Sequence, residues 1–346
     1  MVTDSWGRPV TSLRIQLNAI CNFKCIFCHM EGTPINGSQM EPSEIESVLR
    51  TAARFGVRKV KFTGGEPLLR RDIAEIIRRT RSIIPGDISL TTNGTLLKNK
   101  AKILREAGLD RINISLHSIE PGDFQFITGT DSIDKVREGI REAKAAGFRN
   151  IKLNFVVLKG INVDQIPKMI DFCAHEDLTL QLIEYETTRE NENSDEYLRY
   201  HYSIDGIEND IRNMAIRKES NDLHLRPIYT IMHNGKECRI EFVKPMHNVE
   251  FCMNCTRLRL TSDGKLKTCL MRDDNYIDIL PSLKSKGNID DLYVKSIKLR
   301  EPYWKYDEGE EHKSEIFCKV PGVAGNRRRE TFHTMRNGGW TVGGNK

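Results

Sequence analysis

The chain has 346 residues, of which 38% are hydrophobic and 29% are charged, the composition of an ordinary globular protein. No stretch approaches the roughly 18 apolar residues that span a membrane, and residues 1–8 contain no apolar signal region. The net charge of +5 is too small to indicate a nucleic-acid-binding surface. We therefore expect a cytoplasmic protein with neither a membrane nor a nucleic acid as partner.

Strand-like and helix-like patterns alternate along the first half of the chain. Apolar, β-branched segments predict strands at residues 12–17, 60–62, 88–91, 112–116, 151–158 and 178–183. Helical periodicity predicts helices at residues 42–55, 73–82, 97–107, 133–146 and 163–174. Strands that alternate with helices form parallel sheets with the helices outside. Six units are fewer than the eight of a closed barrel, so we predict an α/β fold with an incomplete (β/α)6 TIM-like barrel.

The pattern changes after about residue 185, which predicts three regions. Residues 1–185 form the partial barrel, and residues 186–300 form a C-terminal extension with more cysteines. The extension begins with polar residues 186–205, which we interpret as a solvated linker or loop. Residues 301–346 form a charged, Gly-rich tail.

Three cysteines within eight residues, Cys21, Cys25 and Cys28, follow the first expected strand. Thiolates suit metals that prefer sulfur, and three are one short of the four that close a structural zinc or iron–sulfur site. A four-iron cluster held by three cysteines keeps one iron open for a small molecule. Because the chain is long and clusters its nine cysteines, metal binding is favoured over disulfides, with a structural zinc knuckle as the alternative.

Glycines and small polar residues follow the next three expected strands. They form the run Gly64-Gly65-Glu66-Pro67 and the segments 91–94 and 115–118. Active sites of parallel barrels lie at the carboxyl ends of the strands, and glycine lets backbone approach a ligand closely. We expect a polar ligand to lie across this rim.

A second trio of cysteines, Cys252, Cys255 and Cys269, lies in the extension. Arg257 and Arg259 lie between its members, and on a strand alternate side chains share one face. Two guanidinium groups on one face suit the binding of phosphates. The Cys-x2-Cys pair alone would equally favour a structural zinc site.

The first trio resembles that of the radical S-adenosylmethionine (SAM) enzymes. The resemblance consists of the Cys-x3-Cys-x2-Cys spacing, Phe27 before the third cysteine, and the Gly-Gly-Glu-Pro run. It implies that the open iron binds SAM and that one-electron reduction cleaves SAM to a 5′-deoxyadenosyl radical. Iron–sulfur potentials extend to about −700 mV, which is low enough for such chemistry.

Residues 251–270, around the second trio, are similar to the C-terminal cluster signature of the GTP 3′,8-cyclases (the MoaA family) of molybdenum cofactor biosynthesis. The resemblance covers nearly the whole chain, including Asp4-x3-Arg8 and Lys152-x-Asn154. It implies a lyase that converts GTP to (8S)-3′,8-cyclo-7,8-dihydroguanosine 5′-triphosphate with SAM and two [4Fe–4S] clusters. It also implies an electron-donor protein and transfer of the product to cyclic pyranopterin monophosphate synthase. A homodimer is compatible with the sequence.

The resemblance assigns roles to individual residues. The first cluster would be held by Cys21, Cys25 and Cys28, and the second, whose free iron would bind guanine, by Cys252, Cys255 and Cys269. SAM would contact Phe27, Gly65 and Ser115. GTP would contact Arg14, Lys61, Thr91, Lys152, Arg257, Leu258 and Arg259, and of these Arg257 and Arg259 are also expected to take part in catalysis. For an isolated Lys or Arg, a surface or ion-paired position is the default interpretation.

Four positions depart from the family pattern. Lys61 replaces the usual arginine and loses its bidentate geometry. Gln181 occupies a common arginine position, and Glu186 stands where a SAM-contacting methionine is typical. The family ends in a Gly-Gly pair that reaches into the active site, and here Gly338-Gly339 and Gly343-Gly344 are rival equivalents.

Two other functions are compatible with the first trio. One is a radical SAM enzyme that modifies peptides and has an auxiliary cluster, although such enzymes usually have more C-terminal cysteines. The other is a cluster-bearing sensor or scaffold. Cys173, Cys238 and Cys318 belong to neither trio, and Cys173 is expected to be a buried core thiol.

Overall fold

The structure, a computed structural model, describes residues 2–32, 39–221 and 223–305. The strands are β1 (Ser12–Gln16), β2 (Lys59–Thr63), β3 (Ile88–Thr92), β4 (Arg111–Ser115), β5 (Ile151–Val157), β6 (Thr179–Glu184), β7 (Ala215–Ser220), β8 (Pro227–His233), β9 (Lys236–Val243), β10 (Arg257–Leu260), β11 (Lys265–Lys267) and β12 (Ile277–Asp278). The helices are α1 (Pro42–Arg54), α2 (Ile73–Arg81), α3 (Ala101–Glu106), α4 (Pro121–Thr128), α5 (Ile133–Ala145), α6 (Ile166–Glu176), α7 (Asp195–Tyr200), α8 (Asp205–Met214), α9 (Val249–Met253), α10 (Leu280–Lys284) and α11 (Asp290–Lys298). Short 3-10 turns are η1 (Met30–Gly32), η2 (Pro67–Leu69), η3 (Leu97–Asn99), η4 (Val163–Gln165) and η5 (Arg189–Asn191).

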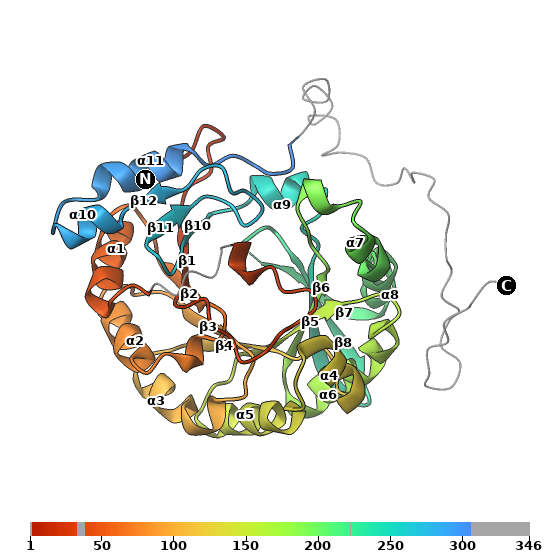
Figure 1. Ribbon diagram of the computed structural model, residues 1–346. Coiled ribbons are helices and arrows are strands. Elements are labelled where there is room, and N and C mark those ends of the chain that lie inside the picture. The colour runs from red at the N-terminus through yellow and green to blue at the C-terminus, as the bar shows by residue number, and fades with distance from the viewer. Residues whose placement is uncertain (1, 33–38, 222, 306–346) are drawn as a thin grey trace.

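The strands form one sheet in the order β12-β11-β10-β1-β2-β3-β4-β5-β6-β9-β8-β7. Strands β1 to β6 pair in chain order and are all parallel, which confirms the incomplete (β/α)6 barrel. The extension lengthens the same sheet at both sides, because β10 pairs with β1 and β9 with β6, again in parallel. Antiparallel strands complete the two edges, and no pairing of described residues joins β12 to β7. Figure 1 shows the strands curving around a centre, with α1, α2, α3, α5 and α6 outside them.

Side chains on the two faces of the parallel strands differ in polarity. Leu13, Phe62, Leu90 and Ile112 are fully buried and belong to the main apolar core between the sheet and the helices. The alternate positions are polar and face the inside of the curved sheet. The strands therefore pack the helices with one face and offer polar groups to the interior with the other.

Local sequence explains where the helices begin and end. In α1, Pro42 is at the first turn, where its missing N–H costs nothing, and the backbone N–H of Glu41 donates to the Glu44 carboxylate at 2.8 Å in a capping box. Ile45, Val48 and Leu49 then follow at helical spacing and are buried. The helix thereby presents one apolar stripe to the sheet.

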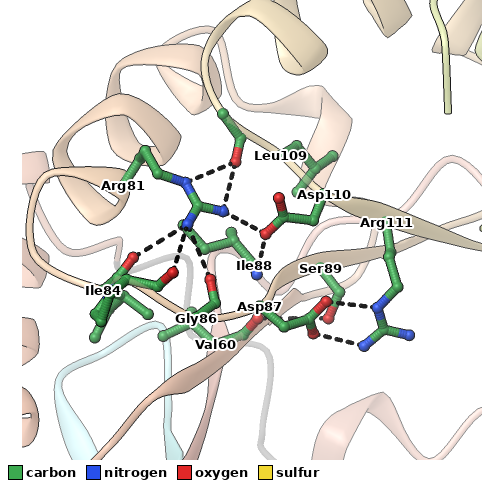
Figure 2. Close-up of polar contacts among 12 residues, drawn as sticks. Val60, Arg81, Ile84, Gly86, Asp87, Ile88, Ser89, Leu109, Asp110 and Arg111 are labelled. Carbon is green, nitrogen blue, oxygen red and sulfur yellow. Dashed lines mark hydrogen bonds and ion pairs between the residues drawn. The ribbon is translucent and has the colours of Figure 1, made fainter.

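Arg81, at the end of α2, fixes the loops at the amino ends of β3 and β4 (Figure 2). Its guanidinium group donates to the carbonyl of Gly108 from Nε at 3.1 Å and from Nη2 at 2.9 Å, and to the carbonyl of Gly86 at 2.9 Å. It also pairs with Asp110, whose carboxylate accepts from the N–H of Ile88 at 2.8 Å. One half-buried guanidinium group thus replaces the backbone partners that these loops lack.

Three expectations about local structure need correction. The segment 97–107 is divided into η3 and α3, and α6 begins only at Ile166, since proline at its first turn suits a helix start. Helix α4, which ends at Gly129 in a left-handed conformation (φ 71°), was not expected. Residues 186–205 contain η5 and α7 as well as loop, and Ser194 caps α7 by accepting from the N–H of Tyr197 at 3.2 Å.

Part of the predicted tail lies outside the described residues, and with it Cys318, Gly338-Gly339 and Gly343-Gly344. Within the described ranges, none of the helices has the length and apolar character that a membrane crossing requires.

Candidate active site

A cavity of about 420 Å³ lies on the polar inner face of the curved sheet. Both cysteine trios line it. So do the other predicted site residues Arg14, Phe27, Lys61, Gly65, Thr91, Ser115, Lys152, Arg257 and Arg259. Leu258 does not line the cavity, because it alternates with the two arginines on β10 and belongs to the apolar core. The structure therefore brings every predicted site residue except Leu258 to one place.

The strand register aligns charged side chains in one row. Arg259 on β10 pairs with Arg14 on β1, which pairs with Lys61 on β2. The same row continues through Ser89 on β3 to Arg111 on β4. Directly paired residues point to the same face of a sheet, so the register itself concentrates positive charge in the cavity.

The cavity lining is strongly basic, with ten Arg or Lys and five Asp or Glu side chains. Lys61 is half-buried, and desolvation together with the charges of Arg14 and Arg111 lowers its pKa well below the usual value. Desolvation and the charges of Arg14 and Arg259 likewise lower the pKa of Arg257. The lining therefore disfavours the charged forms of its own cations, and a bound polyanion would favour them.

The side chains of Lys61 and Arg257 make no hydrogen bond or ion pair with the part of the chain that the structure describes. The Nε of Arg257 is a buried donor that lacks a partner. A buried, unpaired polar or charged group costs free energy unless a partner is supplied. These two side chains are therefore the best candidates for direct contact with an anionic ligand.

Other cations in the lining have protein partners. Arg111 and Asp87 form a bidentate pair with N–O distances of 2.6 and 2.5 Å, visible in Figure 2. Lys152 and Arg226 share the fully buried carboxylate of Glu241, at 2.7 Å from Arg226. These ion pairs hold their Arg and Lys side chains in place but leave part of each side chain able to contact a ligand.

The first cysteine loop is held by backbone contacts. Lys24 and Ile26 donate their N–H groups to the carbonyls of Thr128 and Ile127, at 2.9 and 3.0 Å. Desolvation raises the pKa of the Cys25 thiol to about 12, so metal binding here would release a proton.

The side chains next to this loop are equally well placed. The Sγ of Cys21 accepts from the N–H of Phe23 at 3.3 Å. Phe27 meets the ring of His117 edge to face, with centroids 4.7 Å apart. The loop therefore positions its thiols and Phe27 at the carboxyl ends of the strands.

Gly65 is explained by its contact with the loop before Cys21. A Cβ atom at this position would lie 2.2 Å from the carbonyl oxygen of Ile20. The next residue, Glu66, accepts hydrogen bonds from the hydroxyl of Thr92 and the N–H of Asn93, both at 2.7 Å. Burial raises the pKa of Glu66 to about 6 despite these contacts. The Gly-Gly-Glu-Pro run thus joins the ends of three strands to the cysteine loop.

Replacement of Gly65 by alanine is expected to destabilise the protein by about 1–3 kcal/mol, because the new methyl group overlaps backbone that cannot move away freely. Urea unfolding of the full chain and iron content after anaerobic reconstitution measure the effect. Gly122→Ala is the matched control, since a Cβ atom there meets nothing within 4 Å. Equal stability of the two variants would contradict the steric explanation.

The second cysteine trio is held by a buried ionic network that the sequence alone did not indicate as part of the site. Asp4 accepts a hydrogen bond from Nε of Arg8 at 2.9 Å and forms an ion pair with Arg300, whose Nη1 lies 3.3 Å from Oδ2. Arg8 donates to the carbonyl of Cys252 at 2.7 Å, and Arg300 donates to that of Cys255. The N-terminal segment and the residues just after α11 thus both bind the backbone of this loop.

Within the second trio, the electrostatics favour a thiolate at Cys255 but oppose one at Cys252 and Cys269. Desolvation opposes ionisation of Cys255, but the positive charges of Arg300 and Arg257 hold its pKa below the ordinary value. The donor set of each trio, three soft sulfur ligands on a cavity with room for a further ligand, suits a four-iron cluster. No three His, Cys, Asp or Glu side chains among the described residues converge closely enough to hold a single metal ion.

Several residues of the cavity were not anticipated from the sequence, namely Arg8, Glu31, Arg111, Arg226 and Arg300. Only Arg8 carried a signal, its spacing from Asp4. Glu31 lies close to Cys28 in the sequence but belongs to no expected motif, and Arg111, Arg226 and Arg300 come from distant segments that only the folded chain brings together.

Two family models together match most of the chain. Residues 15–173 match the model described as Radical SAM superfamily, and residues 178–306 match the one described as Molybdenum Cofactor Synthesis C. The boundary between the two matches lies just before β6.

Curated relatives match over their full length. The chain is 49% identical to a probable GTP 3′,8-cyclase of Thermoplasma volcanium over 329 residues, covering 95% of this chain and 100% of that protein. It is 46% identical to a probable GTP 3′,8-cyclase of Pyrococcus abyssi over 307 residues, covering 88% and 100%.

Solved structures share the fold at low identity. Streptococcus suis SuiB bound to S-adenosylmethionine has a TM-score of 0.58 at 17% identity, with 86% of this chain and 65% of that chain covered. The enzyme anSMEcpe with bound AdoMet and a peptide has a TM-score of 0.56 at 18% identity, covering 87% and 85%. With both family models matched in order and close full-length relatives, the chain belongs to the GTP 3′,8-cyclase family of radical SAM enzymes.

Proposed function

We propose that this protein converts GTP to (8S)-3′,8-cyclo-7,8-dihydroguanosine 5′-triphosphate, the first step of molybdenum cofactor biosynthesis. One observation supports this most strongly. Both cysteine trios line a single cavity, and the half-buried cations Lys61 and Arg257, which form no ion pair with a described Asp or Glu, lie in the same lining. Such a cavity holds a radical source and a polyanionic substrate together.

Each trio would hold one [4Fe–4S] cluster, the first with Cys21, Cys25 and Cys28 and the second with Cys252, Cys255 and Cys269. When bound, the clusters and SAM supply a 5′-deoxyadenosyl radical that can take hydrogen from C3′ and an open iron that can bind the guanine ring. The protein's own task is then to hold C3′ and C8 of one GTP molecule in reach of each other and of the radical. Such positioning can account for a large part of the rate.

The triphosphate would bind to the basic side chains of the cavity lining. Lys61 and Arg257 form no ion pair with a described Asp or Glu, and Arg14, Lys152, Arg259 and Thr91 add further donors. Charge-assisted contacts of this kind are strong when water is excluded. SAM would contact Phe27, Gly65 and Ser115 at the ends of the neighbouring strands.

Arg226 would compensate for Gln181, which stands where the family often has arginine. Gln181 on β6 pairs in register with Glu241 on β9, and Glu241 pairs with Arg226 at 2.7 Å. A cation from the residue just before β8 therefore lies next to this position. Glu186, at the other departure, lies 3.6 Å from His29 and keeps no proposed role in SAM binding.

The family relationship also supports the wider setting of the reaction. We propose a cytoplasmic enzyme with an electron-donor protein as reductant and cyclic pyranopterin monophosphate synthase as recipient of the product. The proposed division of the chain is residues 1–185, 186–300 and 301–346, although the second region adds its strands to the sheet of the first.

Anaerobic reconstitution with iron and sulfide, followed by SAM, reductant and GTP, tests the proposal. We expect GTP to be lost as 5′-deoxyadenosine forms, and ATP in place of GTP serves as the control. Formation of 5′-deoxyadenosine without any loss of GTP would contradict the proposed reaction.

A further inference from the structure

Glu31 lies inside the cavity and binds two of the residues assigned to GTP. Its Oε2 accepts from Nη1 of Arg259 at 2.6 Å, and its Oε1 is 3.4 Å from Nη1 of Arg14. The hydroxyl of Thr63 donates to the same Oε1 at 2.7 Å. Both oxygens of one carboxylate thus engage a pair of arginines that the strand register places side by side.

This arrangement resembles the way in which arginines bind a phosphate group. Burial alone would raise the pKa of Glu31, but the charges of Arg14 and Arg259 lower it well below the usual range. The carboxylate is therefore ionised and acts as an internal anion. The Nε of Arg14 has no hydrogen-bond partner, so Glu31 leaves one of the hydrogen-bond donors of this arginine unused.

The contrast with the rest of the lining is informative. The side chains of Lys61 and Arg257 form no ion pair with a described Asp or Glu, whereas Arg14 and Arg259 share Glu31. A ligand whose phosphates contact all four cations competes with Glu31 for two of them. Glu31 is not part of the sheet but of the short turn η1, which follows the first cysteine loop.

The backbone at Glu31 is unfavourable. Met30 and Glu31 both have positive φ angles, 48° and 55°, in the left-handed region that non-glycine residues rarely adopt. Such conformations persist where the surrounding contacts hold them. Loss of the two arginine contacts would remove what holds this turn.

We infer that Glu31 is a positioning residue that holds Arg14 and Arg259 until the triphosphate of the substrate displaces it. The inference rests on the proposed function, because it takes the ligand of the basic side chains in the cavity to be a nucleoside triphosphate. Before binding, Glu31 neutralises the two arginines and fixes their side chains. On binding, the phosphates take its place, and the turn is free to move.

Equilibrium binding to the reconstituted full-length protein tests the inference. Glu31→Gln keeps the shape and an acceptor for Thr63 but removes the charge, so GTP affinity is expected to rise on the order of tenfold. Guanosine, which has no phosphates, is expected to bind the wild type and the variant equally. A residue with a merely structural role would lower the affinity or leave it unchanged.

Two further variants make the test specific. Glu186→Gln also removes one carboxylate whose charge acts on Arg14, but it breaks no hydrogen bond to either arginine, so it is expected to raise GTP affinity by less than about twofold. Thr63→Val weakens the hold on Glu31 without changing the charge and is expected to give a smaller gain in the same direction. It also provides a second reading if Glu31→Gln folds poorly.

An unchanged or weakened GTP affinity in Glu31→Gln, or an equal gain in Glu186→Gln, would overturn the inference alone, provided that the wild type binds GTP. Failure of the wild type to bind GTP would overturn the proposed function and this inference with it.

Discussion

Replacement of Arg257 by alanine is expected to weaken GTP binding by about 10- to 150-fold, which corresponds to the loss of about 1.5–3 kcal/mol for a hydrogen bond to a charged group. The reason is that this guanidinium group is buried, lines the cavity and has no protein partner for its Nε. Its binding capacity is therefore available to a ligand. Equilibrium binding of GTP to the reconstituted protein measures the change.

Three comparisons identify the source of that loss. Arg257→Lys keeps the charge but not the planar fork, and it is expected to retain part of the affinity. Arg79→Ala removes an arginine from the outside of α2, where it pairs with Glu46 and Glu75, and leaves GTP binding unchanged. Cleavage of SAM without substrate continues in all three variants. A wild-type affinity in Arg257→Ala would remove this residue from the phosphate site.

Replacement of Cys255 by serine is expected to lower the iron content of the reconstituted protein from about eight to about four atoms per chain, because each four-iron cluster depends on its own thiolates. Arg300 and Arg257 favour the ionised form of the Cys255 thiol. The substitution therefore removes the cysteine of the second trio that ionises most readily. Iron and sulfide analysis measures the change, and SAM cleavage by the first cluster is retained.

The control for this prediction is another buried cysteine. Cys173→Ala removes a fully buried thiol that belongs to the apolar core rather than to the cavity, and iron content stays at about eight atoms per chain. If the wild type itself binds only about four irons while the first trio is intact, the second cluster does not exist.

The prediction of the fold succeeded where local patterns were sufficient. Apolar β-branched runs located the six strands of the partial barrel to within a few residues, and the parallel order followed from the helices between them. The boundaries of η3 and η4 were missed, since 3-10 turns and α-helices share nearly the same apolar spacing. The pairing of β9 and β10 with opposite sides of the same sheet depends on long-range contacts, which periodicity does not contain.

The sequence by itself determined the chemistry of the site. Three cysteines within eight residues and two arginines on alternate strand positions are local features, so their shared geometry follows from backbone periods alone. Only the tertiary structure decided how these parts combine. The register across β10, β1 and β2 aligns Arg259, Arg14 and Lys61, and the loop that contains Glu31 returns to two of them. The contacts of Arg259 with Arg14 and Glu31 join residues more than two hundred positions apart. They exist because the curved sheet surrounds a polar interior that only a folded chain possesses.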